Sequence, residues 1–177
     1  MILLLSSLFT AMADSYKVDP IHSGVFFRVK HFDVGYTYGR FNDISGKVKT
    51  ETSLSSIELS IKAESVDSNN ARRDRHLQGP DFLDAKQFPT IIFTSSSITS
   101  AGENNFTVQG ELVLHGHTQP LTITLEQTGQ GEDSWGNERI GYEASFSINR
   151  SDFGMEHMQN SISDTVYLMV AFEAIKQ

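Results

Sequence analysis

Apolar residues recur at every second position in seven stretches of this chain, and this period of two constrains its fold more than any other feature. In the first stretch, Val25, Phe27 and Val29 share one face, with Arg28 and Lys30 on the other. The stretches are 22–31, 56–66, 90–98, 106–116, 121–128, 142–150 and 165–175, and a weaker one lies at 44–52. Such alternation is typical of β-strands that bury one face.

Short turn-like segments separate these strands, at 35–39, 100–105, 116–120 and 129–137. Closely spaced strands without intervening helices indicate an antiparallel sandwich or barrel. The prolines, at positions 20, 80, 89 and 120, are expected at strand edges or in connections, where a missing N–H costs least. The sequence therefore predicts one all-β domain, of about eight strands, over residues 14–177.

One segment, residues 68–86, does not follow the strand pattern. Ser68, Asn69 or Asn70 is suited to begin a helix, and ARRDRHLQ at 71–78 lacks β-branched residues. Gly79 is suited to end the helix, and Pro80 to begin a further turn. We therefore expect a short helical insertion around residues 69–84.

The inward faces of the predicted strands are almost wholly apolar, which leaves two possibilities open. Eight antiparallel strands closed into a barrel hold either a solid core or one ligand. Twelve phenylalanines favour an aromatic-lined cavity, but aromatic rings also fill solid cores well.

Charge and cysteine content exclude several classes of function. The chain has 22 acidic and 14 Lys or Arg residues, a net charge of −8. Because a negative field repels phosphate backbones, nucleic acid is excluded as a partner. Without cysteine, the chain has no disulfides and no cysteine-based metal or redox chemistry.

The first thirteen residues, MILLLSSLFTAMA, differ from the rest of the chain. A short apolar run is followed by an Ala-Met-Ala cleavage pattern, which predicts a signal peptide over residues 1–13, although no Lys or Arg precedes the run. The alternative, a membrane anchor, needs a longer apolar stretch. We expect export to the periplasm and a mature chain that starts at Asp14, with no transmembrane segment left after cleavage.

Catalytic and metal motifs are weak. His115 and His117 are two apart, but Gly116 predicts a turn between them, and no histidine–carboxylate pattern has metal-ligand spacing. Ser23 and His22 are strand neighbours that point to opposite faces, so they form no catalytic dyad. For Asp81 and Asp84, solvated or salt-bridged roles are favoured over acid–base catalysis. The sequence predicts no enzyme, no catalytic residue, no metal and no cofactor.

The charged stretch at 72–76 leaves one question open. Arg73 and His76 are three apart and share a helix face, and Asp74 is placed to pair with one of the four basic side chains of this stretch. An arginine fork suits an anionic head group at a barrel mouth. The other interpretation is that Arg73 and His76 only hold the helix to neighbouring loops.

Five segments together resemble the YceI-like family of secreted bacterial polyisoprenoid-binding proteins, over essentially the whole mature chain. They are DPIHSGVFFRVKH (19–31), GRFNDISGKV (39–48), RDRHLQGPDFLDAKQFPTIIFTS (73–95), VQGELVLHGHTQPL (108–121) and INRSDFGM (148–155). The departures are mild: Leu83 replaces a common aromatic residue, and GHTQP at 116–120 replaces GVTKP.

The resemblance implies an eight-stranded antiparallel lipocalin-like barrel with a long apolar tunnel. It implies a periplasmic protein that carries or sequesters a long-chain isoprenoid-type lipid, such as a polyprenyl phosphate or a quinone-like molecule, and a possible homodimer. The residues that we expect to line the tunnel are Val25, Phe27, Val29, Ile61, Phe93, Leu112, Leu114, Phe146 and Ile148. His31, Arg73 and His76 are candidates for its polar end. Two alternatives are a solid-cored stress or scaffolding protein and a quinone-linked lipid-modifying enzyme.

Overall fold

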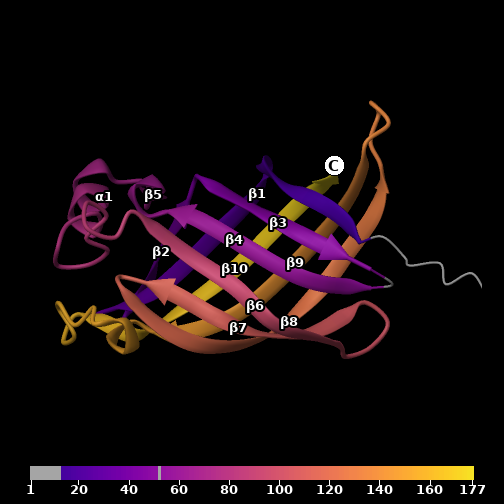
Figure 1. The fold of residues 1–177 in the computed structure, drawn as a ribbon. Coiled ribbons are helices and arrows are strands. Elements are labelled where there is room, and N and C mark those ends of the chain that lie inside the picture. The colour runs from indigo at the N-terminus through magenta and orange to yellow at the C-terminus, as the bar shows by residue number, and fades with distance from the viewer. Residues whose placement is uncertain (1–12, 52) are drawn as a thin grey trace, which may run out of the picture.

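The computed structural model describes residues 13–51 and 53–177 and is dominated by β-strands (Figure 1). The predicted signal peptide therefore lies outside the described residues, except for Ala13. The strands are β1 (Asp14–His31), β2 (Gly35–Phe41), β3 (Ile44–Thr50), β4 (Leu54–Lys62), β5 (Val66–Asp67), β6 (Thr90–Ser100), β7 (Asn105–Leu114), β8 (His117–Glu132), β9 (Glu138–Asn149) and β10 (Ile162–Lys176). One α-helix, α1 (Ala71–Leu77), and two short 3₁₀ helices, η1 (Ala63–Ser65) and η2 (Arg150–Phe153), complete the described part.

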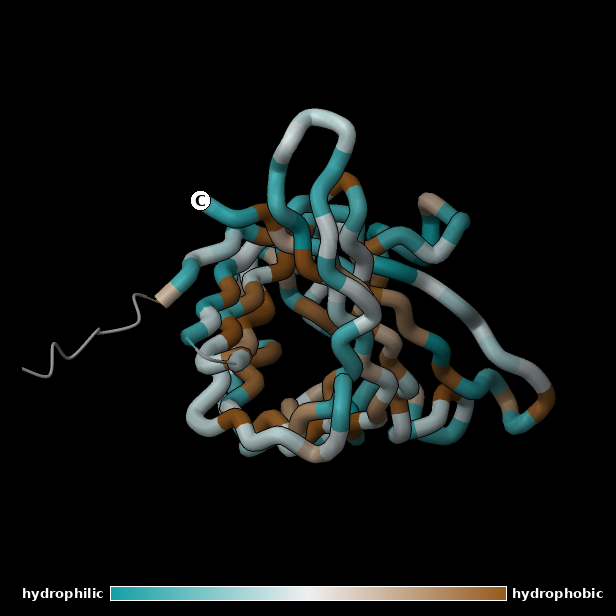
Figure 2. The backbone as a smooth tube through the Cα atoms, turned by 90° about the vertical axis from the view of Figure 1, so that its right-hand side faces the viewer, coloured by the Kyte–Doolittle hydropathy of each residue, from teal (hydrophilic) through white to brown (hydrophobic). Residues whose placement is uncertain are grey.

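The strands form a closed antiparallel barrel. Neighbours follow the order β10-β9-β8-β7-β6-β4-β3-β1, and β1 pairs with β10 to close the ring of eight strands. The predicted all-β barrel is thus confirmed. The strands run obliquely across the barrel in Figure 1, and an end-on view is given in Figure 2.

Two short strands outside the ring were not predicted. The glycines at 35 and 39 indicated a turn, but Gly35–Phe41 is β2, which pairs with the second half of β1. Phe27 lies against Gly39, where a Cβ atom would approach its ring to 2.3 Å. Gly39 is therefore a strand residue that leaves room for an aromatic ring opposite it. β5 pairs with the end of β2.

The helical insertion is shorter than predicted. Asn70 caps α1, and its side chain accepts hydrogen bonds from the backbone N–H groups of Arg72 and Arg73. The helix ends at Leu77, and turns rather than helix follow. Gly79 ends the helix, because its N–H donates to the carbonyl of His76 in a tight turn. The carbonyl of Gly79 accepts hydrogen bonds from two further backbone N–H groups.

The turn predicted at 116–120 is present at Gly116 but is shorter than predicted, because β8 already begins at His117. His115 and Gly116 have φ angles of 51° and 74°, which is the left-handed pair typical of a two-residue hairpin turn. β7 and β8 therefore form a tight hairpin, and the rings of His115 and His117 stack with centroids 6.2 Å apart.

β8 and β9 are bonded over only part of their length. Their ladder begins at the pair Glu126–Glu143 and runs toward the β8–β9 turn. The first half of β8 therefore has one free edge, and Pro120 lies in that half, as expected of a proline in a strand. Between this half and β9 lies a small hollow of about 210 Å³, bordered by Gln119 and Ser147.

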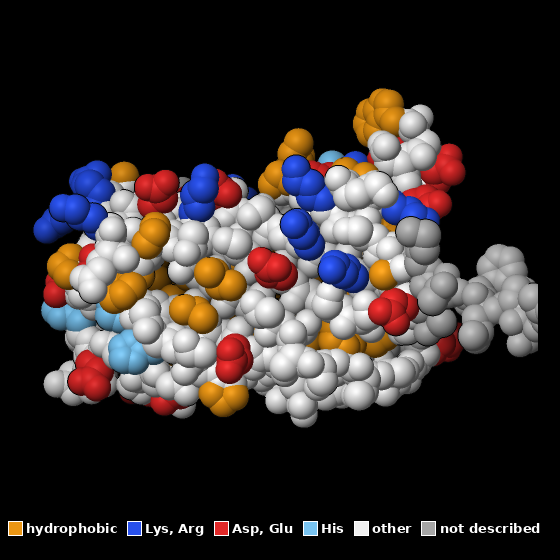
Figure 3. Space-filling view, in the orientation of Figure 1, with side chains coloured by type: hydrophobic (Ala, Val, Ile, Leu, Met, Phe, Trp, Pro, Cys, Tyr) orange, Lys and Arg blue, Asp and Glu red, His pale blue; other side chains and the backbone are white. Residues whose placement is uncertain are grey.

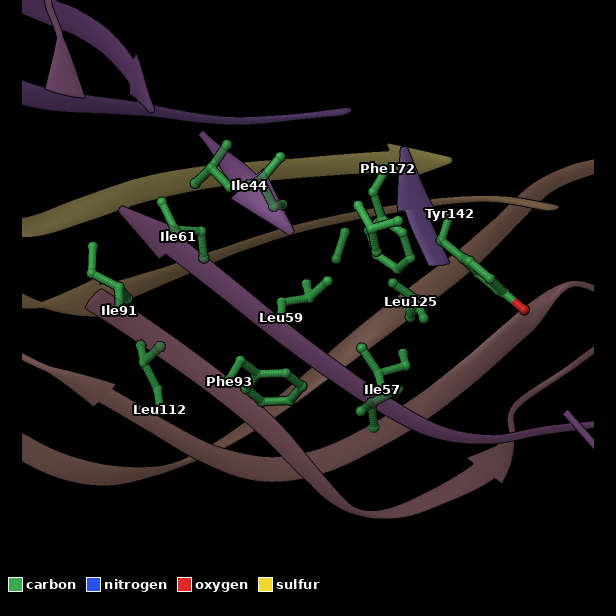
Figure 4. Packing of buried hydrophobic residues seen from close by; sticks show 14 of the residues in the cluster. Ile44, Ile57, Leu59, Ile61, Ile91, Phe93, Leu112, Leu125, Tyr142 and Phe172 are labelled. Carbon is green, nitrogen blue, oxygen red and sulfur yellow. The ribbon is translucent and has the colours of Figure 1, made fainter. Parts of the chain in front are cut away.

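The interior differs between the two ends of the barrel. At the end away from α1, a tight layer of side chains fills the barrel; this layer comprises Tyr16, Val18, Val48, Leu54, Phe106, Val108, Ile140, Tyr142 and Ala174. Figure 4 shows inward-pointing side chains of the buried cluster, with Tyr142 near this end. The half nearer α1 is hollow. The two possibilities left by the sequence, a solid core and a cavity, thus both occur, one at each end.

Candidate ligand-binding cavity

A cavity of about 450 Å³ occupies the half of the barrel nearer α1. This volume is typical of small-molecule sites. Its walls come from alternate residues of the barrel strands, because successive strand side chains point to opposite faces. On β10, for example, Leu168 and Val170 face the cavity, whereas Met169 faces outward.

All twelve residues that the sequence predicts as ligand-binding line this cavity. They are Val25, Phe27, Val29, His31, Ile61, Arg73, His76, Phe93, Leu112, Leu114, Phe146 and Ile148. Their contact with a ligand stays a prediction. For the residues on barrel strands the alternation was the signal, because a closed barrel directs every inward position toward one axis; Arg73 and His76 lie on α1 and came from the charged stretch instead.

The cavity ends in a floor beside the packed layer. Ile57, Leu125, Ala144 and Phe172 line the cavity at this end. Leu125 pairs with Phe106 of the packed layer, and the Phe172 ring lies 5.4 Å from that of Tyr142. Beyond them lies the packed layer around Tyr142, so a bound chain entering from the α1 end would stop here.

The mouth of the cavity lies beneath α1 and the loop between η2 and β10. In Figure 3, histidine and hydrophobic side chains gather at this end, on the left. Leu77, Phe82 and Leu83 of the insertion contribute to the lining, as do Met155 and Met158 of the loop.

Arg73 and His76 make the structural contacts that the sequence offered as one interpretation, and their contact with a ligand's head group stays a prediction. The Nε of Arg73 donates to Ser68 Oγ at 2.7 Å, and its Nη2 donates to the Ser68 carbonyl at 2.6 Å. His76 Nε2 lies 3.1 Å from Asp81 Oδ2. Both side chains therefore hold α1 to neighbouring segments, and both also border the cavity.

The predicted pairing of Asp74 with a basic side chain of residues 72–76 is absent from the ion pairs of the described residues. Asp74 Oδ1 instead accepts hydrogen bonds from the backbone N–H and the hydroxyl of Ser68, at 2.8 and 2.5 Å. Ser68 is buried, so these bonds satisfy its polar groups where water does not reach them. Arg73 and Asp74 thus meet on the same serine.

Arg150 is a lining residue that the sequence reasoning missed. It is 4% exposed and donates to the carbonyls of Met155, Ile162 and Ser163. Burial lowers the pKa of its guanidinium from the usual value, and nearby Asp164 opposes this shift. A buried cation beside the mouth is suited to an anionic head group. Its place in the motif INRSDFG was the available signal.

At the other side of the barrel, Arg139 joins three carboxylates. Its Nη1 donates to Asp19 Oδ2 at 2.7 Å and to Glu173 Oε2 at 3.0 Å, and its Nε donates to Asp133 Oδ2 at 2.8 Å. Burial alone would raise the pKa of Asp19, but hydrogen bonds from His22 and Arg139 outweigh it and lower this pKa to about 2. The network ties the β8–β9 hairpin to β1 and β10.

Two groups in the described part of the chain bring together side chains able to hold a metal ion. One is Asp19, His22 and Glu173, in which Arg139 already binds both carboxylates. The other is His76, Asp81 and His157, at the cavity mouth. Neither group has metal-ligand spacing in the sequence.

The family model for the YceI-like domain matches residues 16–174. The chain belongs to the YceI-like family. A relative called UPF0312 protein, from Pseudomonas aeruginosa (strain LESB58), is 38% identical over 97% of this chain and 94% of its own length. Another, from Pseudomonas putida (strain W619), is 36% identical over 94% of this chain and 89% of its own length.

Solved structures of YceI-like barrels share the fold. The YCEI protein of Campylobacter jejuni superposes with a TM-score of 0.76 at 27% identity, over 84% of this chain and 90% of its own. BcnA of Burkholderia cenocepacia gives 0.79 at 24% identity, over 88% and 98%. A polyisoprenoid-binding domain from Saccharophagus degradans gives 0.74 at 18% identity, over 92% and 98%.

Across residues 13–51 and 53–177, no helix has the length and apolar character needed to cross a membrane.

Proposed function

We propose that this YceI-like protein binds one long-chain isoprenoid-type lipid, such as a polyprenyl phosphate or a quinone-like molecule, and carries or sequesters it in the periplasm. The observation that supports this most is the cavity, which has a volume of about 450 Å³, is lined almost wholly by apolar side chains and is closed at the packed end of the barrel. Polyisoprenoid binding by the Saccharophagus degradans domain of similar fold adds support.

The apolar lining supplies enough free energy for binding without a head-group contact. Each buried methylene contributes about 0.8 kcal/mol, so a chain of 10–15 carbons contributes roughly 8–12 kcal/mol before ordering costs are subtracted. The chain would lie against the floor, with its head at the mouth near Arg73, His76 and Arg150. We therefore propose binding without catalysis.

Mass spectrometry of organic extracts of the purified full chain tests the proposal. We expect a stoichiometric isoprenoid-type lipid, chemically unaltered, or uptake of added polyprenyl phosphate or ubiquinone by the delipidated protein. An empty protein that takes up none of these compounds would count against lipid binding. A ligand released in altered form would favour the lipid-modifying enzyme instead.

Two adjacent residues on β10 provide a matched pair of variants. Leu168→Gln places an amide in the cavity, and a bound chain would strip water from it at a cost of about 1–3 kcal/mol. Binding should weaken about tenfold to a hundredfold. Met169→Gln, on the outer face, should leave binding unchanged. Equal effects of both substitutions would show that binding does not use the cavity.

A filled interior would support the scaffolding alternative, and the hollow half of the barrel does not give it that support. Periplasmic export stays part of the proposal, and N-terminal sequencing of the protein recovered from a periplasmic fraction should give Asp14 as the first residue. The possible homodimer stays a prediction, which analytical ultracentrifugation would check.

A further inference from the structure

Two histidines and an aspartate from separate segments meet at the cavity mouth. His76 lies in the last turn of α1, Asp81 follows the turn at Gly79, and His157 comes from the loop between η2 and β10. One donor atom from each of the three lies within 4.8 Å of the others. Because 76 positions separate Asp81 from His157, only the folded barrel brings this group together.

The carboxylate lies between the two imidazoles. Asp81 Oδ2 is 3.1 Å from His76 Nε2, and Asp81 Oδ1 is 3.9 Å from His157 Nδ1. In the described part of the chain these two imidazoles are the ion-pair partners of Asp81, and no Lys or Arg competes for it. The second candidate group differs, since Arg139 bonds to both of its carboxylates.

A buried aromatic ring supports both imidazoles. The ring of Phe82 makes edge-to-face contacts with His76 and His157, at centroid distances of 5.0 and 5.4 Å, and the two imidazoles meet edge to face at 5.6 Å. Phe82 is 6% exposed. Phe82 therefore holds both imidazole rings in place from the protein interior. The side chains of His76, Asp81 and His157 remain 41–50% exposed and are accessible to an ion.

We infer that His76, Asp81 and His157 form a binding site for a divalent transition-metal ion, with Zn²⁺ as the best fit. Imidazole and carboxylate together suit zinc, and bonds of about 2.0–2.2 Å in a tetrahedral shell place donor atoms ~3.3 Å apart. The His76–Asp81 distance already meets this value. His157 Nδ1 lies 3.9 Å from the other oxygen of Asp81, and one donor atom of each residue lies within 4.8 Å of the others, so each separation needs to shorten by no more than ~1.5 Å.

Three protein ligands leave a fourth position of a tetrahedral ion for an external oxygen. Because His76 also lines the cavity, this position lies at the mouth, where water or an anionic head group would reach it. Binding of the ion does not require the proposed lipid function. The sequence predicted no metal site, so this inference departs from that expectation.

Titration of the delipidated, tag-free full chain with Zn²⁺ by calorimetry tests the inference. We expect one ion per chain and a melting temperature that rises with Zn²⁺, as binding to the folded state requires. His157→Ala and Asp81→Asn should each weaken binding at least tenfold and abolish most of the rise. Circular dichroism of the metal-free variants checks that they fold, as their exposed side chains predict.

His22→Ala is the matched control, because His22 belongs to the other candidate group. This variant should leave Zn²⁺ binding unchanged. If His22→Ala lost Zn²⁺ binding and His157→Ala kept it, the site would not be at the mouth and the assignment would be overturned. Co²⁺ provides a second readout, since its visible spectrum reports coordination, and the band should disappear in His157→Ala. A wild-type chain that binds neither ion would refute the site while leaving lipid binding intact.

Discussion

The floor of the cavity makes the length of the bound chain a measurable quantity. Along β10, lining residues extend from Ile162 to Phe172, ten positions apart. At about 3.3 Å per residue and a strand tilt of 35–45°, this corresponds to a depth of ~25 Å. A residue of extended polypeptide spans ~3.5 Å over three bonds, so an extended lipid chain advances ~1.2 Å per bond. A depth of ~25 Å therefore holds about 20 carbons, and the affinity for lipids of increasing length should stop rising near this number.

Ala144→Phe should shorten this limit. Ala144 lies at the floor on β9, and the next lining residue toward the mouth is Phe146, one two-residue step away. That step is ~6.6 Å along the strand and ~5 Å along the axis, or about four carbons. At ~0.8 kcal/mol per methylene the loss is ~3 kcal/mol, which is more than a hundredfold in Kd for chains that reach the floor.

Displacement of a fluorescent lipid probe by a series of straight-chain and isoprenoid alcohols measures the limit. The optimum of Ala144→Phe should fall about four carbons below that of the wild type, and short chains should bind both equally. Ser145→Phe is the control, because Ser145 is exposed on the outer face of the same strand. An unchanged optimum in Ala144→Phe would refute insertion of the chain down to this floor.

Three further predictions concern stability. The Tyr142 hydroxyl is buried without a hydrogen-bond partner in the described structure, and burial raises its pKa. Tyr142→Phe removes this hydroxyl and should therefore raise the free energy of unfolding, measured in urea, by about 1 kcal/mol. A decrease of that size would show that the hydroxyl has a hydrogen-bond partner. Arg139→Leu leaves buried Asp19 without its arginine partner and should lower the free energy of unfolding by about 2–4 kcal/mol. The pKa of Asp19 is lowered from 3.8 to about 2, so its carboxylate stabilises the wild-type fold fully above about pH 4, and this contribution is lost as the pH falls toward 2. In thermal melts at acid pH the wild type should therefore lose ~2 kcal/mol of folding stability from this group, and Arg139→Leu should lose less. Gly110→Ala should destabilise by about 1–3 kcal/mol, since its Cβ would meet the Thr94 carbonyl at 2.4 Å, whereas Gly129→Ala, with open space, should change thermal stability little.

The period-two pattern was sufficient for the walls of the barrel because it depends on a local property. A strand places alternate side chains on opposite faces whatever its partners are, so Val25, Phe93 and Phe146 were assigned to the interior before any pairing was known. The resemblance to the YceI-like family then chose the barrel over the sandwich. The sequence patterns were less reliable where a glycine makes room for a side chain of the paired strand. Gly39 was assigned to a turn, but it lies in a strand against the ring of Phe27.

By itself, the sequence determined the strand faces, the all-β class and the place of the helical insertion, because each follows from residues close together in the chain. Tertiary structure alone decided that one half of the barrel is packed and the other hollow, since volume depends on how eight strands close. It also placed Arg150 at the mouth and brought His157 to Asp81 and His76. Contacts between residues distant in the chain have no local signal, because they arise only when the barrel closes.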